Sequence, residues 1–281
     1  MKRLLTLLTM ITFLAACGRS QSTPPTPTED TLTGKITFAG STTMQPLVAQ
    51  LGDEFRRLHP YVTMDIAAGG SAVGIKAIHD GTTDIGMASR ALTANEAAGI
   101  NQYQVAIDVL ALVVHPTNPI KNLTLSQLQD IFMGKLTNWQ SLGGPDLAII
   151  PVQRETSSGS RGAFDEMVLK NQTATAQNLI TTATAGDEAA SVAKNPGAIG
   201  YVGFGNIDKT VKVITINGIL PTQETAQNNS YPLTRPLIFM TGPLSQPLAK
   251  TFIDFALSAP GQKSIQDLGW VPVPIIDSTP R

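Results

Sequence analysis

Short apolar runs alternate with longer amphipathic stretches along most of the chain. The run KITFAG (35–40) is followed by a stretch with one apolar helix face, at spacings of four, four and three, formed by Leu47, Leu51, Phe55 and Leu58. A similar face recurs near the C-terminus in SQPLAKTFIDFALSAPG (245–261), which predicts one last helix. Strands that alternate with helices are typical of an α/β fold with largely parallel sheets.

Apolar runs bounded by turn residues predict the remaining strands, and periodic stretches predict the remaining helices. The most apolar run, VLALVVHP (109–116), predicts a buried strand. No fixed period recurs, which argues against solenoid and propeller architectures. The other predicted strands are 62–70, 83–89, 147–153, 198–204 and 235–242, and the other predicted helices cover 71–81, 125–134, the residues around Phe164 and the residues before the Asn195-Pro196-Gly197 turn.

The N-terminal residues have the pattern of a secretion signal. Lys2 and Arg3 precede an apolar stretch over 4–14 that is shorter than the about 20 residues of a membrane-spanning helix. The segment ends in LAAC, which is similar to the lipobox of bacterial lipoproteins, where cleavage precedes a cysteine that carries lipid. We therefore expect a signal peptide over 1–16, lipid on Cys17 and a flexible tether over 17–33, which is rich in Thr, Ser and Pro.

Cysteine content and charge restrict the function classes. Cys17 is the only cysteine among 281 residues, so the chain has no disulfide framework and no cysteine-based metal site. Cleavage before Cys17 removes Lys2 and Arg3 and leaves 18 basic residues against 21 acidic ones, a formal charge of −3. A mildly acidic body lacks the basic surface that is typical of nucleic-acid binding.

One arrangement recurs at three predicted junctions between a strand and a helix. Glycine and hydroxyl residues follow the strand each time, and Arg154 precedes the third cluster. Helix N-termini carry unpaired N–H groups and partial positive charge, hydroxyls add donors, and a guanidinium suits an oxyanion. Each cluster alone also fits an N-cap, but open α/β sheets bind ligands at this edge, so together they predict an anion site. The clusters are Ser41-Thr42-Thr43, Ser71 and Ser157 to Ser160.

Catalytic motifs are absent or incomplete. GGSAVGIK (69–76) approaches a phosphate-binding loop, but Lys76 comes one place late and no Ser or Thr follows it. No GxSxG turn, HExxH motif or Asp-rich calcium loop occurs. The histidines, His59, His79 and His115, fall at predicted element ends, where surface and capping positions are common. We therefore expect a binding protein without metal or cofactor rather than an enzyme.

Seven segments resemble, in the same order, those of the phosphate-binding lipoproteins of ABC phosphate importers, within the type II periplasmic-binding-protein superfamily. The resemblance implies two lobes, each a mostly parallel sheet flanked by helices, with a ligand cleft between them and two crossover strands as a hinge. Lobe I would comprise 34–112 and 231–281, and lobe II would comprise 113–230. The segments are AGSTTMQPL, GGSAVGIKAI, DIGMASRAL, LTLSQLQDIFMGKLTNW, VQRETSSGSRGAFDEMVL, NPGAIGYV and YPLTRPL, between about Lys35 and Gly269.

The resemblance also implies a binding shell to which both lobes contribute. In the family an aspartate follows the serine of the third segment and accepts a proton from phosphate, whereas this chain has Arg90 there. This leaves four alternatives for the proton acceptor: Glu155, Asp84, a backbone carbonyl, or none. Two roles stay open for Arg90, a second cation on the ligand or an ion-pair partner of Asp84. We expect Ser41 to cap its helix. The implied phosphate ligands are Thr42, Thr43, Ser71, Ser89, Arg90, Arg154, Ser158, Gly159 and Ser160.

The expected function is extracytoplasmic binding of inorganic phosphate and its delivery to the permease of an ABC importer. The expected protein is a monomer, lipid-anchored at the periplasmic face or the cell surface, without a nucleic-acid partner. Three alternatives stay open: binding of another tetrahedral oxyanion such as sulfate, molybdate or tungstate, a phosphatase-type hydrolase, and a structural surface lipoprotein that has lost its ligand.

Overall fold

The structure is a computed structural model that describes residues 32–243 and 245–275. The predicted signal peptide, Cys17 and most of the predicted tether lie outside the described residues. Among the helices that are described, none combines the length and the apolar character needed to cross a membrane.

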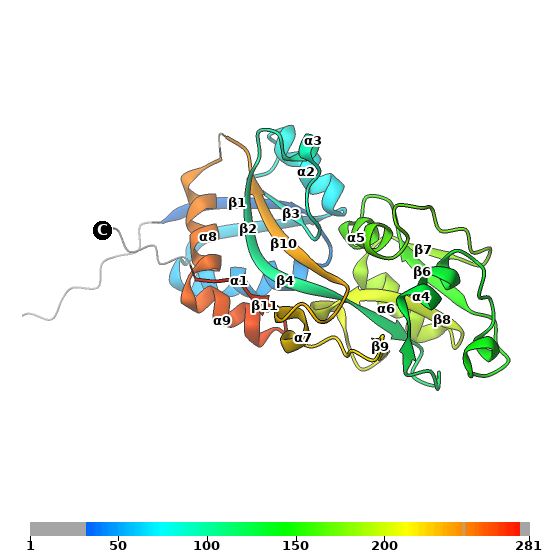
Figure 1. Cartoon of the computed structure of the whole chain (residues 1–281). Coiled ribbons are helices and arrows are strands. Elements are labelled where there is room, and N and C mark those ends of the chain that lie inside the picture. Colours follow the sequence, from blue (N-terminus) through cyan, green and yellow to red (C-terminus); the bar gives the residue numbers. More distant parts are fainter. Residues whose placement is uncertain (1–31, 244, 276–281) are drawn as a thin grey trace, which may run out of the picture. The chain divides into compact units, whose positions relative to one another are not determined.

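Lobe I is built on three parallel strands, with β1 in the centre (Figure 1). The helix α1 returns the chain from β1 to β2, with Pro46 in its first turn, and buries Leu47, Leu51 and Phe55 in the core of this lobe. Three of the four residues whose spacing predicted this helix therefore form its buried face, whereas Leu58, in the last turn, is exposed. The elements are β1 (Thr33–Gly40), α1 (Gln45–Leu58), β2 (Tyr61–Ala68), α2 (Ser71–His79), β3 (Ile85–Ala88) and α3 (Ala94–Ala97).

Two strands connect the lobes. β4 (Asn101–Val114) pairs antiparallel with β10 (Thr234–Thr241), and Arg235 lies opposite Asp108 in this register. β10 also pairs with β3 of lobe I, and β4 pairs with β8 (Ala198–Gly203) of lobe II. The strand order β2-β1-β3-β10-β4-β8-β6-β7 therefore makes β4 and β10 the crossover strands, which Figure 1 shows running between the two lobes.

Lobe II repeats the parallel arrangement. β6 lies between β8 and β7 and runs parallel to both, and the helices α5 and α6 follow β6 and β7. β9 pairs antiparallel with the end of β4 and parallel with the short β5. The elements are β5 (Asn122–Leu123), α4 (Leu125–Phe132), η1 (Trp139–Leu142), β6 (Ile150–Arg154), α5 (Gly159–Met167), β7 (Ile180–Thr182), α6 (Ala185–Lys194), η2 (Phe204–Asn206), β9 (Lys212–Ile216) and α7 (Gln223–Gln227).

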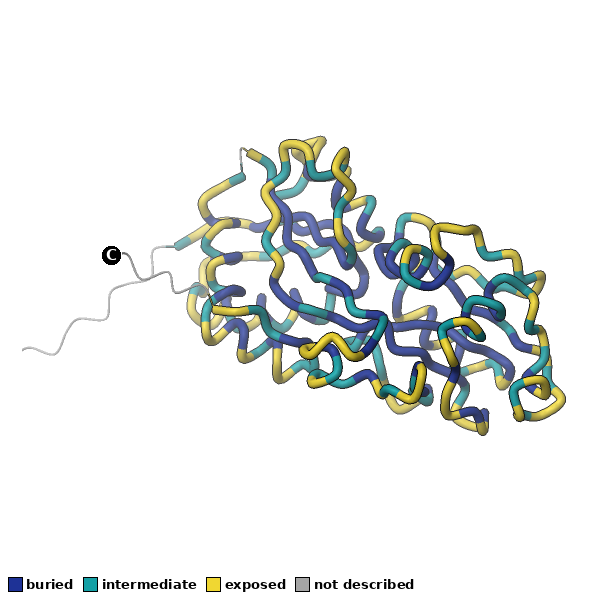
Figure 2. The backbone as a smooth tube through the Cα atoms, in the orientation of Figure 1, coloured by how far each residue is buried: buried dark blue, intermediate teal, exposed yellow. Residues whose placement is uncertain are grey.

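Each lobe has a hydrophobic core of its own. Phe38, Phe55 and Phe252 pack edge to face in lobe I, with ring centroids 5.1 and 5.3 Å apart. In lobe II the ring of Phe164 stacks on that of Tyr201 at 4.0 Å. Figure 2 shows buried backbone along most of the strands that join these cores. The two lobes are therefore separately packed bodies that share β4 and β10.

The predicted last helix is two helices, α8 (Pro247–Leu257) and α9 (Ala259–Asp267). Ser258 ends the first and caps the second, since its Oγ accepts from the N–H of Gly261 at 3.5 Å. Pro260 stands in the first turn of α9, where a proline is tolerated although it cannot continue a preceding helix. Both helices pack into the hydrophobic core that holds β1 and α1, and the chain then pairs β11 (Val271–Pro272) with β4.

Candidate functional site

Three serines of lobe I are hydrogen-bonded to one another at the carboxyl ends of the parallel strands. Ser41 follows β1, Ser71 begins α2 and Ser89 follows β3. Ser41 Oγ donates to Ser89 Oγ (2.9 Å), and Ser71 Oγ accepts from the Ser89 N–H (3.0 Å). Ser41 therefore links two loops and does not cap α1, whose N-cap position is Met44 without a side-chain hydrogen bond.

The corresponding junction of lobe II is the start of α5. Ser158 is the N-cap of this helix, and its Oγ accepts from the Arg161 N–H (3.4 Å). Gly159 and Ser160 form the first helical positions and are buried. The predicted cluster thus provides the N-cap of α5, and the N–H groups of the first two helical residues are left without an intrahelical acceptor.

The two lobes meet at these junctions. Ser160 Oγ of lobe II lies 3.1 Å from Thr43 Oγ1 of lobe I, and the Ala185 N–H, at the start of α6, donates to Thr42 Oγ1 (3.3 Å). All these residues are buried. The threonines expected to face the ligand therefore lie at the boundary between the lobes.

Gly159 permits an unusually close approach of the lobes. A Cβ atom at this position would lie 2.2 Å from Ser71 Oγ and 2.7 Å from Ser89 Oγ. Beside it, Ser157 Oγ lies 2.9 Å from the carbonyl oxygen of Gly69 in lobe I. Any larger residue would therefore displace the hydroxyls of Ser71 and Ser89 from their hydrogen bonds, or hold the lobes further apart.

Backbone donors without acceptors gather at the same place. Helices leave their first N–H groups without intrahelical partners, and the helix dipole adds partial positive charge there. Leaving a buried donor unpaired costs about 1–3 kcal/mol, so a cluster of such groups calls for an acceptor. Such groups here include the N–H groups of Ser71, Gly159 and Ser160 at the starts of α2 and α5, and those of Thr42 and Thr43 in the turn before α1, which find no acceptor among the described residues.

Arg154 is a buried cation at the end of β6 and is 1% exposed. Its Nε and Nη2 donate to the carbonyls of Thr182 and Ala183, just before α6, and within the described part of the chain nothing accepts from Nη1. Burial lowers the pKa of Arg154, and the nearby acid Glu188 opposes this shift. The side chain is therefore held rigidly with one donor group to spare.

Arg235 is a second buried cation, which the sequence analysis did not select. Its Nε and Nη2 donate to Asp108 Oδ2 (3.0 and 2.8 Å), and its Nη1 donates to Ser160 Oγ (2.8 Å) and to the carbonyl of Ser89 (3.2 Å). It lies within the segment YPLTRPL, and a charged residue amid the apolar residues of a predicted buried strand was the available signal. Arg235 therefore contacts predicted ligands of both lobes.

Arg90 is engaged elsewhere. Its Nη1 and Nη2 donate to the two carboxylate oxygens of Glu96 (2.8 and 2.7 Å), and this bond holds the pKa of Glu96 at about 2. Asp84 is not its partner, because that carboxylate accepts from the N–H and hydroxyl of Thr37. Arg90 is thus the one predicted ligand whose charge is already paired by a carboxylate.

The acidic residues near the site differ in how well they are paired. Glu155 accepts from the hydroxyl of Ser157 (2.8 Å), and Asp108 accepts four hydrogen bonds. Glu188 on α6 is buried, and its Oε2 has no partner. Burial raises the pKa of Glu188 to about 8, against the opposing effects of the Tyr201 N–H, Arg154 and Arg235.

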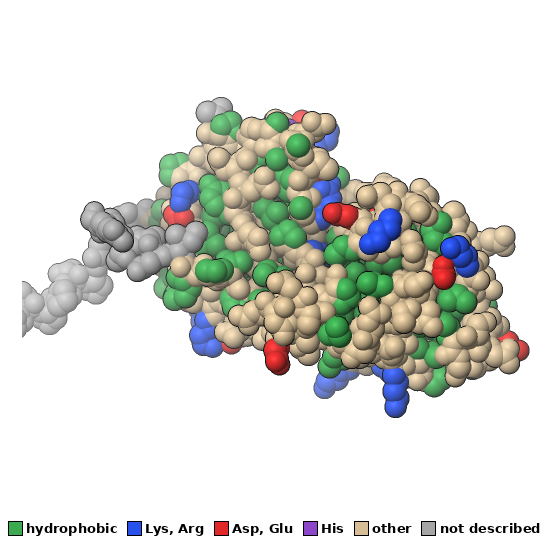
Figure 3. All heavy atoms as spheres, viewed as in Figure 1, with side chains coloured by type: hydrophobic (Ala, Val, Ile, Leu, Met, Phe, Trp, Pro, Cys, Tyr) green, Lys and Arg blue, Asp and Glu red, His purple; other side chains and the backbone are tan. Residues whose placement is uncertain are grey.

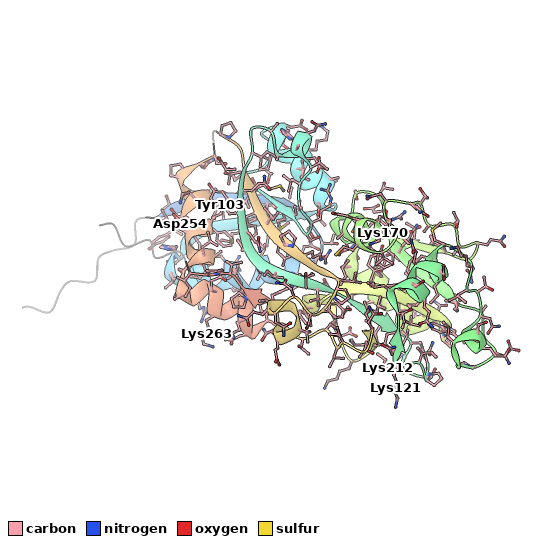
Figure 4. All side chains as sticks on the ribbon, in the orientation of Figure 1. Tyr103, Lys121, Lys170, Lys212, Asp254 and Lys263 are labelled. Carbon is pink, nitrogen blue, oxygen red and sulfur yellow. The ribbon has the colours of Figure 1, made fainter. Side chains whose placement is uncertain are left out.

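The outer surface carries its charges separately from this cluster. Figure 3 shows basic and acidic side chains interspersed on one face, and Figure 4 shows Lys121 and Lys263 pointing outward. In the described ranges, no group of three His, Cys, Asp or Glu side chains could hold a metal ion. The donors gathered where the lobes meet are hydroxyls, backbone N–H groups and guanidinium groups, which are the ligands of an oxyanion.

Two lobes joined by two crossover strands, with donors of both lobes meeting between them, define a class of solute-binding proteins. Residues 25–260 match the family model of the PBP superfamily domain, and the chain belongs to this superfamily. The phosphate-binding protein PstS of Bacillus subtilis is 32% identical over 286 residues, which cover 96% of this chain and 94% of that protein. PstS of Borreliella burgdorferi is 29% identical and covers 84% of this chain and 89% of that protein.

Solved structures agree in fold. A Clostridium perfringens protein, assigned as a phosphate ABC transporter substrate-binding protein and solved with bound phosphate, has a TM-score of 0.81 and 36% identity. The match covers 86% of this chain and 100% of that chain. An ABC-type phosphate transport receptor from Vibrio cholerae has a TM-score of 0.71 and 32% identity, over 85% and 100% of the two chains. The two-lobed α/β fold expected from the sequence is thereby confirmed.

Proposed function

We propose that this protein binds inorganic phosphate between its lobes and delivers it to an ABC importer. The observation that carries this proposal is the cluster of five buried N–H groups without acceptors, beside Arg154 and Arg235, where the lobes meet. Relatives named phosphate-binding proteins, which match nearly the whole chain, support the choice of phosphate as the anion.

The site suits a dehydrated tetrahedral oxyanion. Burial of an anion is costly unless nearly every oxygen lone pair receives a hydrogen bond, and charge-assisted bonds are the strongest. Three helix N-termini, the hydroxyls and Arg154 offer such bonds from several directions. The proposed ligands are Thr42, Thr43, Ser71, Ser89, Arg154, Ser158, Gly159 and Ser160, with Arg235 behind them and Arg90 outside them.

We further propose that the lobes move as bodies about β4 and β10. Lobe I comprises 34–112 and 231–281, and lobe II comprises 113–230. Because the donors belong to both lobes, opening divides the shell and closure assembles it around the anion. Binding and closure are therefore one event in this proposal.

Titration calorimetry tests the ligand and the site together. The wild-type protein should bind phosphate, and Arg154→Ala should weaken binding about 10- to 100-fold, the value of a hydrogen bond to a charged group. Lys170→Ala, which removes an exposed cation of the same lobe, is the matched control and should leave affinity unchanged. A loss of only a few-fold in Arg154→Ala would contradict the assigned site.

Competition separates the rival ligands. Sulfate, molybdate or tungstate that displaces phosphate at equal concentration would assign the site to another oxyanion. If neither phosphate nor any of these three anions changes the thermal stability, the protein is a structural surface lipoprotein. Release of product from a chromogenic phosphate ester would indicate a hydrolase, and we expect none.

We also propose that the protein works outside the cytoplasm, as a monomer held to the membrane by lipid on Cys17. The LAAC segment supports this proposal, although it lies outside the described residues. Cells expressing the full chain should incorporate labelled fatty acid and retain the protein in the membrane fraction. Cys17→Ser should abolish both, and Ser20→Ala is a control that should change neither.

A further inference from the structure

Glu188 has a carboxyl oxygen for which the described residues provide no partner. The side chain is 1% exposed, its Oε1 accepts from the Tyr201 N–H (3.1 Å), and its Oε2 is buried without a hydrogen bond. Gly200 lies under the carboxyl group, where a Cβ atom would be 3.3 Å from Oε1. A buried oxygen of this kind needs a donor if it is charged and an acceptor if it carries a proton.

The position of Glu188 points to the proposed anion as that partner. Glu188 follows Ala185 by three residues on the buried face of α6, and the Ala185 N–H reaches across to Thr42 of lobe I. Arg154 donates to the two carbonyls just before α6, so its guanidinium group lies at the same helix end. The carboxyl group therefore lies within electrostatic reach of Arg154 and Arg235, on the helix whose N-terminus contacts Thr42 of the proposed site.

Each element packed against α6 contributes differently to the electrostatics of Glu188. Arg154 from β6 and Arg235 from β10 favour its charged form, and Tyr201 from β8 donates its N–H. The segments β7 and η2 carry no charged side chain, and Asp108 of β4 is already paired with Arg235. On α6 itself, Asp187 is exposed. Burial outweighs these favourable contacts and raises the pKa of Glu188 to about 8, so the group is largely neutral at pH 7.

We propose that Glu188 Oε2 shares a proton with the oxyanion bound between the lobes. This inference rests on the proposed phosphate site and adds the proton-holding group that Arg90 cannot provide. Neutral Glu188 donates its O–H to an anion oxygen, whereas ionised Glu188 accepts the O–H of a protonated phosphate. One proton lies between the two oxygens in either case, and no covalent bond to phosphorus changes.

The proposal makes the selectivity between phosphate and sulfate depend on pH. Phosphate carries a proton near neutral pH and can supply the shared one, but sulfate carries none and needs neutral Glu188. Above about pH 8, sulfate binding must take up a proton and should weaken by about tenfold per pH unit. Preference for phosphate should therefore rise with pH.

Calorimetry of the mature chain with phosphate and sulfate, from about pH 6 to about pH 10, measures this directly. In Glu188→Gln the amide oxygen still accepts from Tyr201, while the amide N–H donates at every pH. In this variant the affinity for sulfate should therefore no longer decrease above about pH 8. The ionisation of free phosphate changes the affinity for phosphate equally in both proteins. Equal pH profiles in the two proteins would overturn the proposal, and so would failure of sulfate to bind near pH 6.

Two variants serve as controls. Asp187→Asn removes an exposed carboxylate from the same helix and should keep the wild-type pH profile. Glu155→Gln removes the other carboxylate near Arg154, which already has a hydrogen-bond partner, and should also keep it. If Glu155→Gln rather than Glu188→Gln flattened the profile, the proton would be held by Glu155 and the proposal would be wrong.

Wild-type protein alone suffices if Glu188→Gln does not fold. Calorimetry in buffers of different ionisation enthalpy counts the protons taken up with sulfate, and we expect about one per sulfate above pH 8 and none well below it. No proton uptake overturns the inference while phosphate binding stands. Absence of phosphate binding at every pH overturns the proposed function itself.

Discussion

Arg235 and Asp108 face each other across the two crossover strands, and Arg235 connects both lobes. Its Nη1 donates to the carbonyl of Ser89 in lobe I and to the hydroxyl of Ser160 in lobe II, while Asp108 receives its other two bonds. Asp108 also accepts from the indole N–H of Trp270 (3.0 Å). One buried ion pair thus joins the hinge, the site and the C-terminal segment.

Asp108→Asn should destabilise the protein strongly. The change leaves the buried Arg235 without its counter-charge and turns an amide N–H₂ toward donors, so we expect a loss of about 3–5 kcal/mol in the free energy of unfolding. Urea unfolding followed by circular dichroism measures it. Asp267→Asn is the matched control, because Asp267 pairs with Lys263 on the surface and should cost less than about 1 kcal/mol. Equal losses in the two variants would contradict the role of the buried pair.

Arg90→Ala should have little effect on the binding of phosphate. The guanidinium group is occupied by Glu96, so we expect a change below about fivefold, or about 1 kcal/mol. Glu96→Gln breaks the same pair and should give the same small change by calorimetry. A loss of about 100-fold in Arg90→Ala alone would show that Arg90 contacts the anion, as the family resemblance implied.

Gly159→Ala should block closure of the lobes. The added methyl group would overlap Ser71 Oγ and Ser89 Oγ of lobe I, so binding should fall by at least about 100-fold, while the lobes keep their separate cores. Calorimetry measures the affinity, and small-angle scattering with saturating phosphate measures compaction. Gly186→Ala, in the first turn of α6, is the control, since its Cβ would meet only Thr184 Oγ1 at 3.8 Å. Normal compaction of Gly159→Ala with phosphate would contradict the prediction.

Glu188→Gln should gain stability relative to the wild type as pH rises, without ligand. Burial raises the pKa of Glu188 from its ordinary value of 4.5 to about 8, so the folded state holds a proton that the unfolded chain releases within this window. Its stabilisation is complete below pH 4.5, declines as pH rises and changes no further above about pH 8. The difference between the proteins should therefore grow by up to about 1.4 kcal/mol per pH unit in urea unfolding. A constant difference from pH 5 to pH 8 would contradict it.

Local patterns predicted the fold and much of the proposed site. The spacing of Leu47, Leu51 and Phe55 fixes the buried face of α1, and glycine beside serine at Gly70-Ser71 and Ser158-Gly159 marks helix starts. These are properties of neighbouring residues, which a sequence shows directly. Even so, Ser41 was assigned a cap role that it does not have, because hydroxyls serve caps and loop contacts equally well.

The partners of the charged residues could not be predicted in this way. Asp108 and Arg235 are 127 positions apart, and only the register of β4 against β10 brings them together. Glu188 is one of two neighbouring acids on α6, and burial alone distinguishes it from Asp187. Arg90 occupies a family ligand position, but its guanidinium group forms an ion pair with Glu96, six residues later. Long-range pairing and burial are the properties that a single sequence hides.

The closed arrangement of the lobes depends on the anion because of unpaired N–H groups. These are the N–H groups of Thr42, Thr43, Ser71, Gly159 and Ser160. Lobes that come together without an anion leave these donors unmet, at about 1–3 kcal/mol each, whereas lobes that enclose an anion satisfy them. The joined form is consequently scarce until cargo is present. A transporter that binds only the closed form therefore engages the anion-bound protein and does not hydrolyse ATP for an empty one.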